Sequence, residues 1–183
     1  MSVFSNRGGD ATKEAGAYTA AILGLLGERD PMRVLEAAPA DVAAAVAGLS
    51  DADLGRPEAP GKWSLRRIVR HLADSEIVWG WRLRKIVAED RPAIQGYDQD
   101  LWADRLHYDD ADVAAALEEI RVMRGSNLRL IRALDPDQRL RAGVHSERGD
   151  ESVEHMIRLY AGHDILHLDQ IARVKRALGL KSG

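Results

Sequence analysis

Four long segments with helical periodicity constrain the fold of this chain more than any other feature of its sequence. Apolar residues recur every three or four positions in residues 12–26, 64–90, 111–134 and 152–178. No segment shows the regular alternation of apolar and polar residues that is typical of a half-buried β-strand. The pattern therefore predicts an all-α protein in which four helices form a bundle.

The residues between the first two long segments predict short extra helices in the first crossover of the bundle. An apolar stretch occupies residues 32–37, and Asp41 is a suitable N-cap for a short helix over residues 41–49. Ser64 is an equivalent cap for the second long helix, and Gly179 follows the last one. The long excursion between the first two helices favours a bundle in which one connection joins non-adjacent helices.

Composition and charge narrow the class of protein. A length of 183 residues suits a single domain spanning residues 1–183, of which we expect residues 1–10 to be flexible. The formal net charge of −3 lacks the basic character of a nucleic-acid binder, so no nucleic-acid partner is expected. The absence of Cys excludes disulfides, thiolate metal sites and a cysteine nucleophile. We also expect a cytoplasmic protein without a membrane partner, because no apolar run approaches roughly 18 residues.

The stretch HDILHLDQI carries two histidines, four positions apart, in the last predicted helix. At about 100° of rotation per residue, His163 and His167 lie within the apolar stripe of this helix and point into the bundle. Two neighbouring imidazoles there are either neutral core residues held by hydrogen bonds or ligands of a divalent metal ion. Two ligands do not complete a metal site, so a third is required from another helix.

The second long helix offers that third ligand. His71 lies at the edge of its apolar stripe, about 70° from the centre, from which it can reach a neighbouring helix. Three histidine ligands leave one coordination position open, which is typical of reactive rather than structural metal sites. The other histidines fit less well, because they fall in polar loops where we expect exposure, or to one side of the stripe: His107, His145 and His155.

Three stretches together resemble the DinB-like superfamily, which includes YfiT-type metal hydrolases and bacillithiol- or mycothiol-type S-transferases. They are GKWSLRRIVRHLADSE, YDQDLW and AGHDILHLDQI, and the resemblance covers residues 31–178. Its most specific parts are W-S before a helix with H-L-x-D-x-E, and H-D-x-x-H-x-x-Q near the C-terminus. The resemblance implies a four-helix bundle of up-down-down-up topology, usually a homodimer. It also implies that His71, His163 and His167 hold a divalent metal, zinc or nickel.

The same resemblance implies a metal-dependent enzyme that transfers a low-molecular-weight thiol to an electrophilic small-molecule substrate. Two alternatives stay open, namely a metal-dependent hydrolase and a non-catalytic module that binds a metal or senses a ligand. Because the chain has no Cys, any sulfur nucleophile must arrive as a cosubstrate.

The acidic residues near the histidines bear on hydrolysis, which normally needs a carboxylate beside the metal. In zinc proteases the motif H-E-x-x-H supplies this carboxylate, but the corresponding position here is Asp164. Its side chain is shorter and projects toward the flank of the helix, which disfavours a protease-like mechanism. Asp74 and Glu76 are other candidate acids, and each is equally well explained as a surface charge or as a group that orients a histidine.

Arg124 lies within the apolar stripe of the third long helix, where a guanidinium needs an anionic partner. One interpretation is that Arg124, together with Arg82, faces the metal cavity and binds a carboxylate of the substrate or thiol. The other is a structural ion pair with an acid such as Asp74.

Gln170 continues the histidine face by one turn of the helix. It is a candidate for lining the pocket or holding a water on the metal, and equally for an amide that packs helices together. Three aromatic residues of the loop after the second helix either roof the cavity or anchor that loop: Tyr97, Trp102 and Tyr108.

Overall fold

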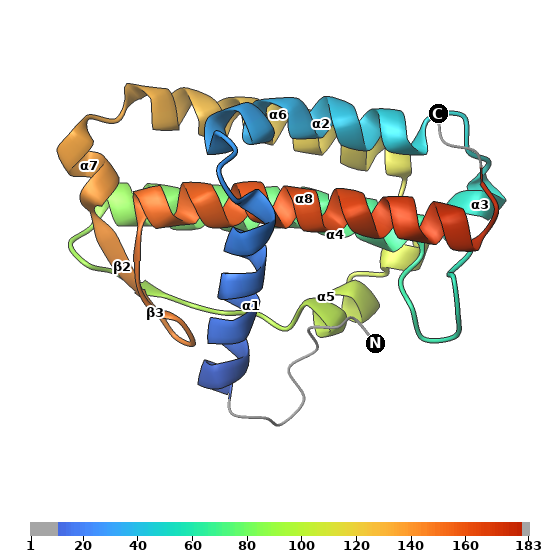
Figure 1. Ribbon diagram of the computed structural model, residues 1–183, viewed down its shortest axis with the longest axis horizontal. Coiled ribbons are helices and arrows are strands. Elements are labelled where there is room, and N and C mark those ends of the chain that lie inside the picture. The colour runs from blue at the N-terminus through green and yellow to red at the C-terminus, as the bar shows by residue number, and fades with distance from the viewer. Residues whose placement is uncertain (1–10, 181–183) are drawn as a thin grey trace.

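The computed structural model describes residues 11–180 (Figure 1). Residues 1–10, which the sequence predicts to be flexible, lie outside the described residues. The elements follow one another along the chain as α1 (Ala11–Leu26), α2 (Pro31–Val46), α3 (Asp51–Gly55), α4 (Leu65–Ala88), β1 (Ala93–Ile94), α5 (Gln99–Arg105), the 3-10 helix η1 (Tyr108–Asp110), α6 (Val113–Ala133), α7 (Pro136–Leu140), β2 (Ala142–His145), β3 (Gly149–Ser152) and α8 (Val153–Ala177).

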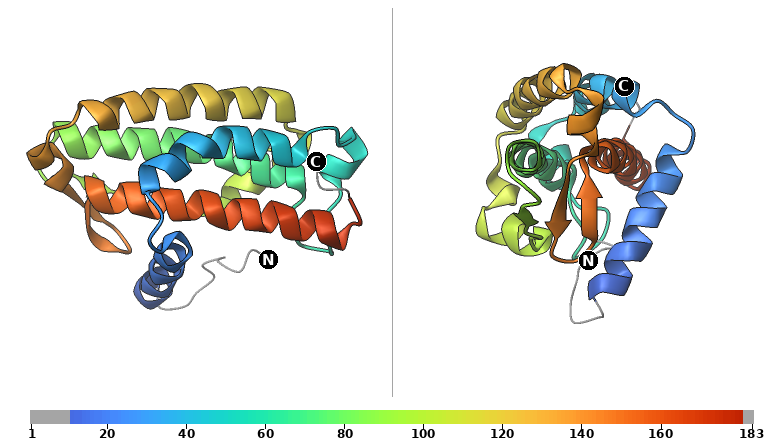
Figure 2. Two further views of the ribbon diagram at one scale, coloured as in Figure 1. Left: turned by 45° about the horizontal axis from the view of Figure 1, so that its top comes forward. Right: turned by 90° about the vertical axis from the view of Figure 1, so that its left-hand side faces the viewer.

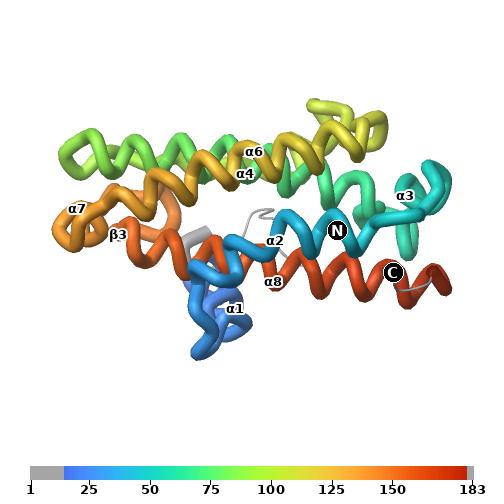
Figure 3. The backbone as a smooth tube through the Cα atoms, turned by 90° about the horizontal axis from the view of Figure 1, so that it is seen from above, coloured from blue at the N-terminus to red at the C-terminus, as the bar shows by residue number. Residues whose placement is uncertain are grey.

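The bundle consists of α2, α4, α6 and α8, which confirms the predicted four-helix architecture. Helices α2 and α8 run in one direction along the bundle, and α4 and α6 run in the opposite direction (Figure 1). Seen from above, α4 and α6 lie along one side, with α2 and α8 along the other (Figure 3). Because α4 and α6 are consecutive bundle helices that run in parallel, residues 89–112 must return along the whole bundle between them.

The first helix of the bundle is α2 rather than residues 12–26, which corrects the expectation from the sequence. Residues 31–46 form one continuous helix, where two short ones were expected. The carboxylate of Asp30 caps it by accepting the backbone N–H of Met32 at 2.9 Å. Pro39 lies inside this helix, and the helix continues through it although proline has no N–H to donate.

Helix α1 lies outside the bundle and crosses α8 (Figure 2). The two helices approach closely at Gly162, where an added Cβ would overlap the backbone of Ile22. The side chains of Ile22 and Leu26 are buried in this contact region and in the adjoining core. The absence of a side chain at Gly162 therefore allows α1 to pack directly on α8.

A small three-stranded sheet, which the sequence did not predict, adjoins the bundle with the order β1-β2-β3. Strand β1 pairs in parallel with β2, and β2 pairs with β3 as an antiparallel hairpin in which Val144 faces Asp150. His145 belongs to this hairpin and is only 2% exposed, so its predicted exposure is wrong. Strands of two to four residues are too short to give the alternating pattern that identifies a strand from sequence.

A polar layer crosses the middle of the bundle and divides its core into two apolar clusters. One cluster contains Trp79 and Leu83 on α4 with Ile131 on α6, and the other contains Ile68 on α4 with Ile171 on α8. The layer between them holds buried charged and imidazole groups from three helices: His71, Glu76, Arg124, Asp164 and His167. None of the helices in the described residues combines the length and apolar character needed to span a lipid bilayer.

Candidate metal centre

Three histidines from α4 and α8 converge in the polar layer. The Nε2 atom of His163 lies 3.3 Å from Nε2 of His71 and 3.1 Å from Nε2 of His167. One ligand nitrogen from each residue can be chosen such that all three lie within 4.8 Å of one another. The structure therefore brings together the three histidines that the sequence selected.

The two distances from Nε2 of His163 match the separation of ligand nitrogens around a single divalent ion. Zinc–nitrogen bonds of about 2.0–2.1 Å at tetrahedral angles place two ligand nitrogens about 3.3 Å apart. The Nε2 atom of a neutral imidazole has either one proton or one lone pair, so it forms one good hydrogen bond. Nε2 of His163 has two close nitrogen neighbours, which is more than hydrogen bonding satisfies. A cation at the centre would satisfy all three lone pairs.

Hydrogen bonds around the cluster orient its rings. The amide oxygen of Gln170 lies 2.8 Å from Nδ1 of His167 and accepts its proton, which leaves the Nε2 lone pair of that ring free to bind a metal. The hydroxyl of Ser75 lies 3.4 Å from Nε2 of His71. Within the described residues, the Nδ1 atoms of His71 and His163 are buried without a hydrogen-bond partner. Gln170 thus supports the cluster through His167, a role that the sequence analysis did not assign to it.

Burial keeps the imidazoles neutral, as metal binding requires. Removal from water lowers the pKa of His71 and His163 well below 6.5 and that of His167 to about 4. The ring of Tyr160 stacks on His163 with centroids 5.3 Å apart, and Trp63 packs edge-on against His71. These contacts hold the rings in place.

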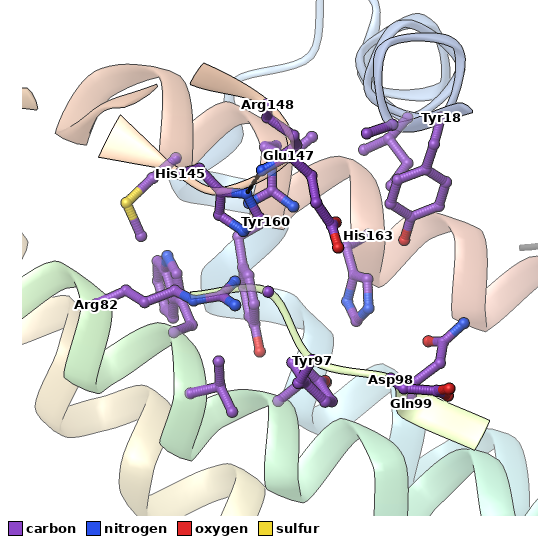
Figure 4. Close-up of a pocket in the computed structure, with 18 of the residues that line it drawn as sticks. Tyr18, Arg82, Tyr97, Asp98, Gln99, His145, Glu147, Arg148, Tyr160 and His163 are labelled. Atoms are coloured by element: carbon purple, nitrogen blue, oxygen red, sulfur yellow. Dashed lines mark hydrogen bonds between the residues drawn. The ribbon is translucent and has the colours of Figure 1, made fainter. Parts of the chain in front are cut away.

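A cavity of about 690 Å³ opens beside the cluster, and His71 and His163 form part of its wall. The rest of the wall comes from other side chains of α4 and α8, from α1, from the chain after β1 and from the hairpin β2–β3 (Figure 4). This volume lies within the range of about 300–1,000 Å³ that is typical of small-molecule sites. The histidine cluster is therefore accessible to a ligand of that size.

Several cavity residues were not selected from the sequence. Tyr18 on α1 lines the wall, as do Glu147 and Arg148 at the tip of the hairpin (Figure 4). The carboxylate of Glu147 packs closely against Gly96, since a Cβ added at Gly96 would lie 2.9 Å from it. Their positions depend on the crossing of α1 and on the hairpin, neither of which the helical periodicity reveals.

Asp74 lies in the polar layer but is engaged by two partners outside the cavity wall. Its carboxylate accepts from Arg70 at 2.5 Å and from the hydroxyl of Tyr108 at 2.5 Å. Tyr108 is 1% exposed, so this aromatic residue anchors its loop to α4. Tyr97 lines the cavity, which is the other role considered for these aromatic residues. Its ring packs against that of Trp102, with centroids 4.5 Å apart.

Arg124 forms a buried ion network rather than a pair with Asp74. Its guanidinium donates to Glu76 at 2.5 and 2.9 Å and to Asp164 at 2.8 and 3.0 Å. Asn127 adds a hydrogen bond to Glu76 at 3.2 Å. Both acids pair with the guanidinium of Arg124, and Arg124 does not line the cavity. Arg82 does line it, so the two arginines considered together from the sequence have separate surroundings.

Comparisons with known proteins agree with this architecture. Residues 34–171 match a family model described as the DinB superfamily. The chain is 30% identical over 149 residues to "Putative metal-dependent hydrolase YfiT" of Bacillus subtilis, an alignment covering 81% of this chain and 84% of that protein. A protein of Oceanobacillus iheyensis, named in the same way, is 31% identical over 126 residues, covering 69% and 73% of the two chains.

The structural comparison leads to the same relative. The solved structure of YfiT, described as "a probable metal-dependent hydrolase with an unusual four-helix bundle topology", superimposes with a TM-score of 0.78 at 30% sequence identity. The match covers 82% of this chain and 87% of that one. Family model, relatives and fold thus confirm the resemblance that the sequence motifs indicated, and the chain belongs to the DinB superfamily.

Proposed function

We propose that this protein is a metal-dependent enzyme that transfers a low-molecular-weight thiol to an electrophilic small molecule. His71, His163 and His167 hold a divalent ion, zinc or nickel, and leave one position open toward the cavity. The names of the relatives support dependence on a metal. The choice of thiol transfer depends on the acids around the cluster.

The observation that carries the proposal is the engagement of those acids. Asp164 and Glu76 are both held by Arg124, and Asp74 is held by Arg70 and Tyr108. None of these three carboxylates lines the cavity, so none is placed to take a proton from a water molecule there. A thiol needs no strong base, because its pKa of about 8.5 is close to neutral pH.

The reaction then requires little from the protein beyond binding and orientation. A divalent ion in the cluster supplies the positive charge that favours the thiolate form of a bound thiol. The thiol proton passes to solvent, the sulfur bonds to the electrophilic carbon, and the leaving group departs with the electron pair of its bond. The cavity holds the two reactants side by side, which lowers the entropic part of the barrier.

Hydrolysis is the second candidate, and one observation favours it. The carboxylate of Glu147 belongs to the cavity wall on which His163 also lies, and it forms no ion pair within the described residues (Figure 4). A carboxylate in that position is suited to accept a proton from water. The names of the relatives, which refer to hydrolases, point the same way.

Metal analysis and two parallel assays test these functions. Protein loaded with zinc or nickel is compared with the His163→Ala variant for metal content, for conjugation of cysteine to monochlorobimane, and for hydrolysis of 4-nitrophenyl acetate. We expect metal-dependent conjugation that the His163→Ala variant lacks. The control is His107→Asn, which removes an exposed histidine and keeps a residue type that tolerates the left-handed backbone at this position.

The outcomes separate the functions. Thiol-independent ester hydrolysis that is lost in Glu147→Gln would favour the second candidate. Stoichiometric metal without turnover in either assay would indicate a non-catalytic module. Wild-type protein that takes up neither metal would refute the metal centre itself.

A further inference from the structure

Buried hydrogen-bond donors gather among the cavity residues other than the metal-binding histidines. Nε1 of Trp79, Nε of Arg82, Nε2 of His145 and the hydroxyl of Tyr160 are each buried without a partner in the described part of the chain. All four residues line the cavity. Figure 4 shows Arg82 and His145 toward one side of the view and His163 toward the other, with Tyr160 between them.

The hydrogen bonding of His145 identifies its unpartnered nitrogen as a donor. Its Nδ1 accepts the backbone N–H of Glu147 at 3.2 Å, so this nitrogen carries no proton. The neutral ring therefore has its proton on Nε2, which is the buried atom without a partner. Burial and the nearby charge of Arg148 lower the pKa of His145 to about 4, so the neutral form is present at physiological pH.

Arg82 contributes a positive charge that is not paired with a carboxylate within residues 11–180. Its Nη2 donates to the backbone carbonyl of Gln95, but Arg82 forms no ion pair in the part of the chain that the structure describes. The adjacent Arg148 differs, because Glu151 accepts from it at 2.5 and 2.9 Å. A partly buried guanidinium without a counter-ion is costly, and a ligand anion removes that cost.

We infer that Arg82, His145 and Tyr160 form a subsite that binds a carboxylate of the small-molecule substrate. A carboxylate is an acceptor only, and it complements a guanidinium, a neutral imidazole N–H and a phenol O–H. Trp79, whose ring stacks on Tyr160 with centroids 4.1 Å apart, forms the apolar side of this subsite. The expected substrate therefore carries a carboxylate at one end and its reacting atom near the three histidines.

The inference deepens the proposed function and rests on it, since it takes the cavity to be the substrate site. What the inference adds to the proposed function is that the cavity binds a carboxylate more tightly than a neutral group of the same shape. Benzoate and benzamide differ in this respect and have nearly equal volume, so they serve as probes. Their binding is measured by titration calorimetry, on protein stripped of metal by a chelator and on protein loaded with zinc.

We expect benzoate to bind at least about tenfold more tightly than benzamide to both preparations, since hydrogen bonds to a charged group are the stronger kind. The preference should disappear in Arg82→Gln and shrink about threefold in Tyr160→Phe, a variant that keeps the stacked ring. Arg33→Gln, which removes a guanidinium with an 87% exposed side chain, should leave the preference unchanged. Circular dichroism establishes that each variant is folded, and Arg82→Met, which also removes the charge, replaces Arg82→Gln if the latter unfolds.

Two results would overturn the subsite. One is equal affinity of the wild type for both probes, which would mean that water satisfies the donors. The other is a preference that appears only with zinc and survives in Arg82→Gln, which would place the carboxylate on the metal. Zinc content and thiol conjugation are measured on the same samples. Protein that prefers benzoate but lacks zinc binding and thiol conjugation would refute only the proposed enzyme. Protein that binds zinc and conjugates the thiol but does not prefer benzoate would refute only the subsite.

Discussion

The guanidinium of Arg124 on α6 donates from Nη1 to the backbone carbonyl of Leu35 on α2, at a distance of 2.7 Å. Leu35 lies four residues before Pro39, which has no N–H with which to complete the helical hydrogen bond to that carbonyl. The side chain of Arg124 on α6 thus supplies the hydrogen-bond donor that the backbone of α2 lacks at Pro39. Together with Glu76 and Asp164, this contact ties α2, α4, α6 and α8 to a single cation.

Replacement of Arg124 by Met should therefore destabilise the fold strongly. The variant leaves two buried carboxylates without a counter-ion and the carbonyl of Leu35 without a donor. Breaking a buried ion pair from one side costs about 3–5 kcal/mol of unfolding free energy. Urea unfolding measures this loss. The matched control is Arg132→Met on the same helix, whose exposed pair with Glu36 is worth no more than about 1 kcal/mol. Equal losses in the two variants would contradict the structural role of Arg124.

Replacement of Gln170 by Leu should weaken metal binding while leaving the ligands in place. The variant removes the acceptor for Nδ1 of His167, and loss of such a supporting hydrogen bond lowers metal affinity by about 10–100-fold. Competition with a chromophoric chelator measures the zinc dissociation constant. Asp169→Asn, at the exposed neighbouring position, should bind zinc as the wild type does. An unchanged affinity in Gln170→Leu would show that His167 needs no such orientation.

The stability of the protein should depend on pH through His145. Its pKa in the folded state is about 4 and lies below the usual 6.5, so between these values the unfolded chain binds more protons. Stability is therefore present at pH 7 and falls as the pH drops through this window. Between pH 7 and pH 5 we expect the wild type to lose about 1–2 kcal/mol more than His145→Gln, whose amide oxygen still accepts the Glu147 N–H. Urea unfolding at the two pH values measures the difference. Parallel pH profiles would mean that His145 titrates normally.

A methyl group at Gly162 should push α1 away from α8. The added Cβ in Gly162→Ala would overlap the backbone of Ile22, and overpacking of this kind costs about 1–3 kcal/mol. Because Tyr18 and Ile22 on α1 line the cavity, binding of small ligands should weaken as well. Thermal unfolding and limited proteolysis of α1 measure the effect. Gly125→Ala on α6 meets only the end of the Arg129 side chain, at 3.5 Å, and should be neutral or slightly stabilising.

The helical faces were predictable from the sequence because rotation per residue is nearly constant along a helix. That constancy predicts that His163 and His167 point into the bundle from α8, and that His71 lies at the edge of the apolar stripe of α4, within reach of a neighbouring helix. It also identified Arg124 as buried. The rotation per residue does not reveal which side chain of a neighbouring helix a buried residue contacts. The sequence therefore suggests Asp74 as an ion-pair partner of Arg124, whereas the structure shows Glu76 and Asp164.

Other features escaped prediction for local reasons. Pro39 divides α2 into two apparent segments in the sequence, and the hydrogen bond from Arg124 to the carbonyl of Leu35 could not be foreseen from the local sequence. The hairpin β2–β3 is short and polar, so the burial of His145 within it had no signal in the sequence. The crossing of α1 depends on one small residue, Gly162, whose partner lies 140 positions away at Ile22.

The parallel course of α4 and α6 forces residues 89–112 to travel the length of the bundle, and this return leg supplies part of the cavity wall. The three imidazoles belong to rigid bundle helices, whereas much of the opposite wall belongs to connections. Connections tolerate insertion and substitution far better than packed helices do. A scaffold divided in this way can acquire new chemical preferences through substitutions in its connecting segments, while the geometry of the three-histidine cluster stays unchanged.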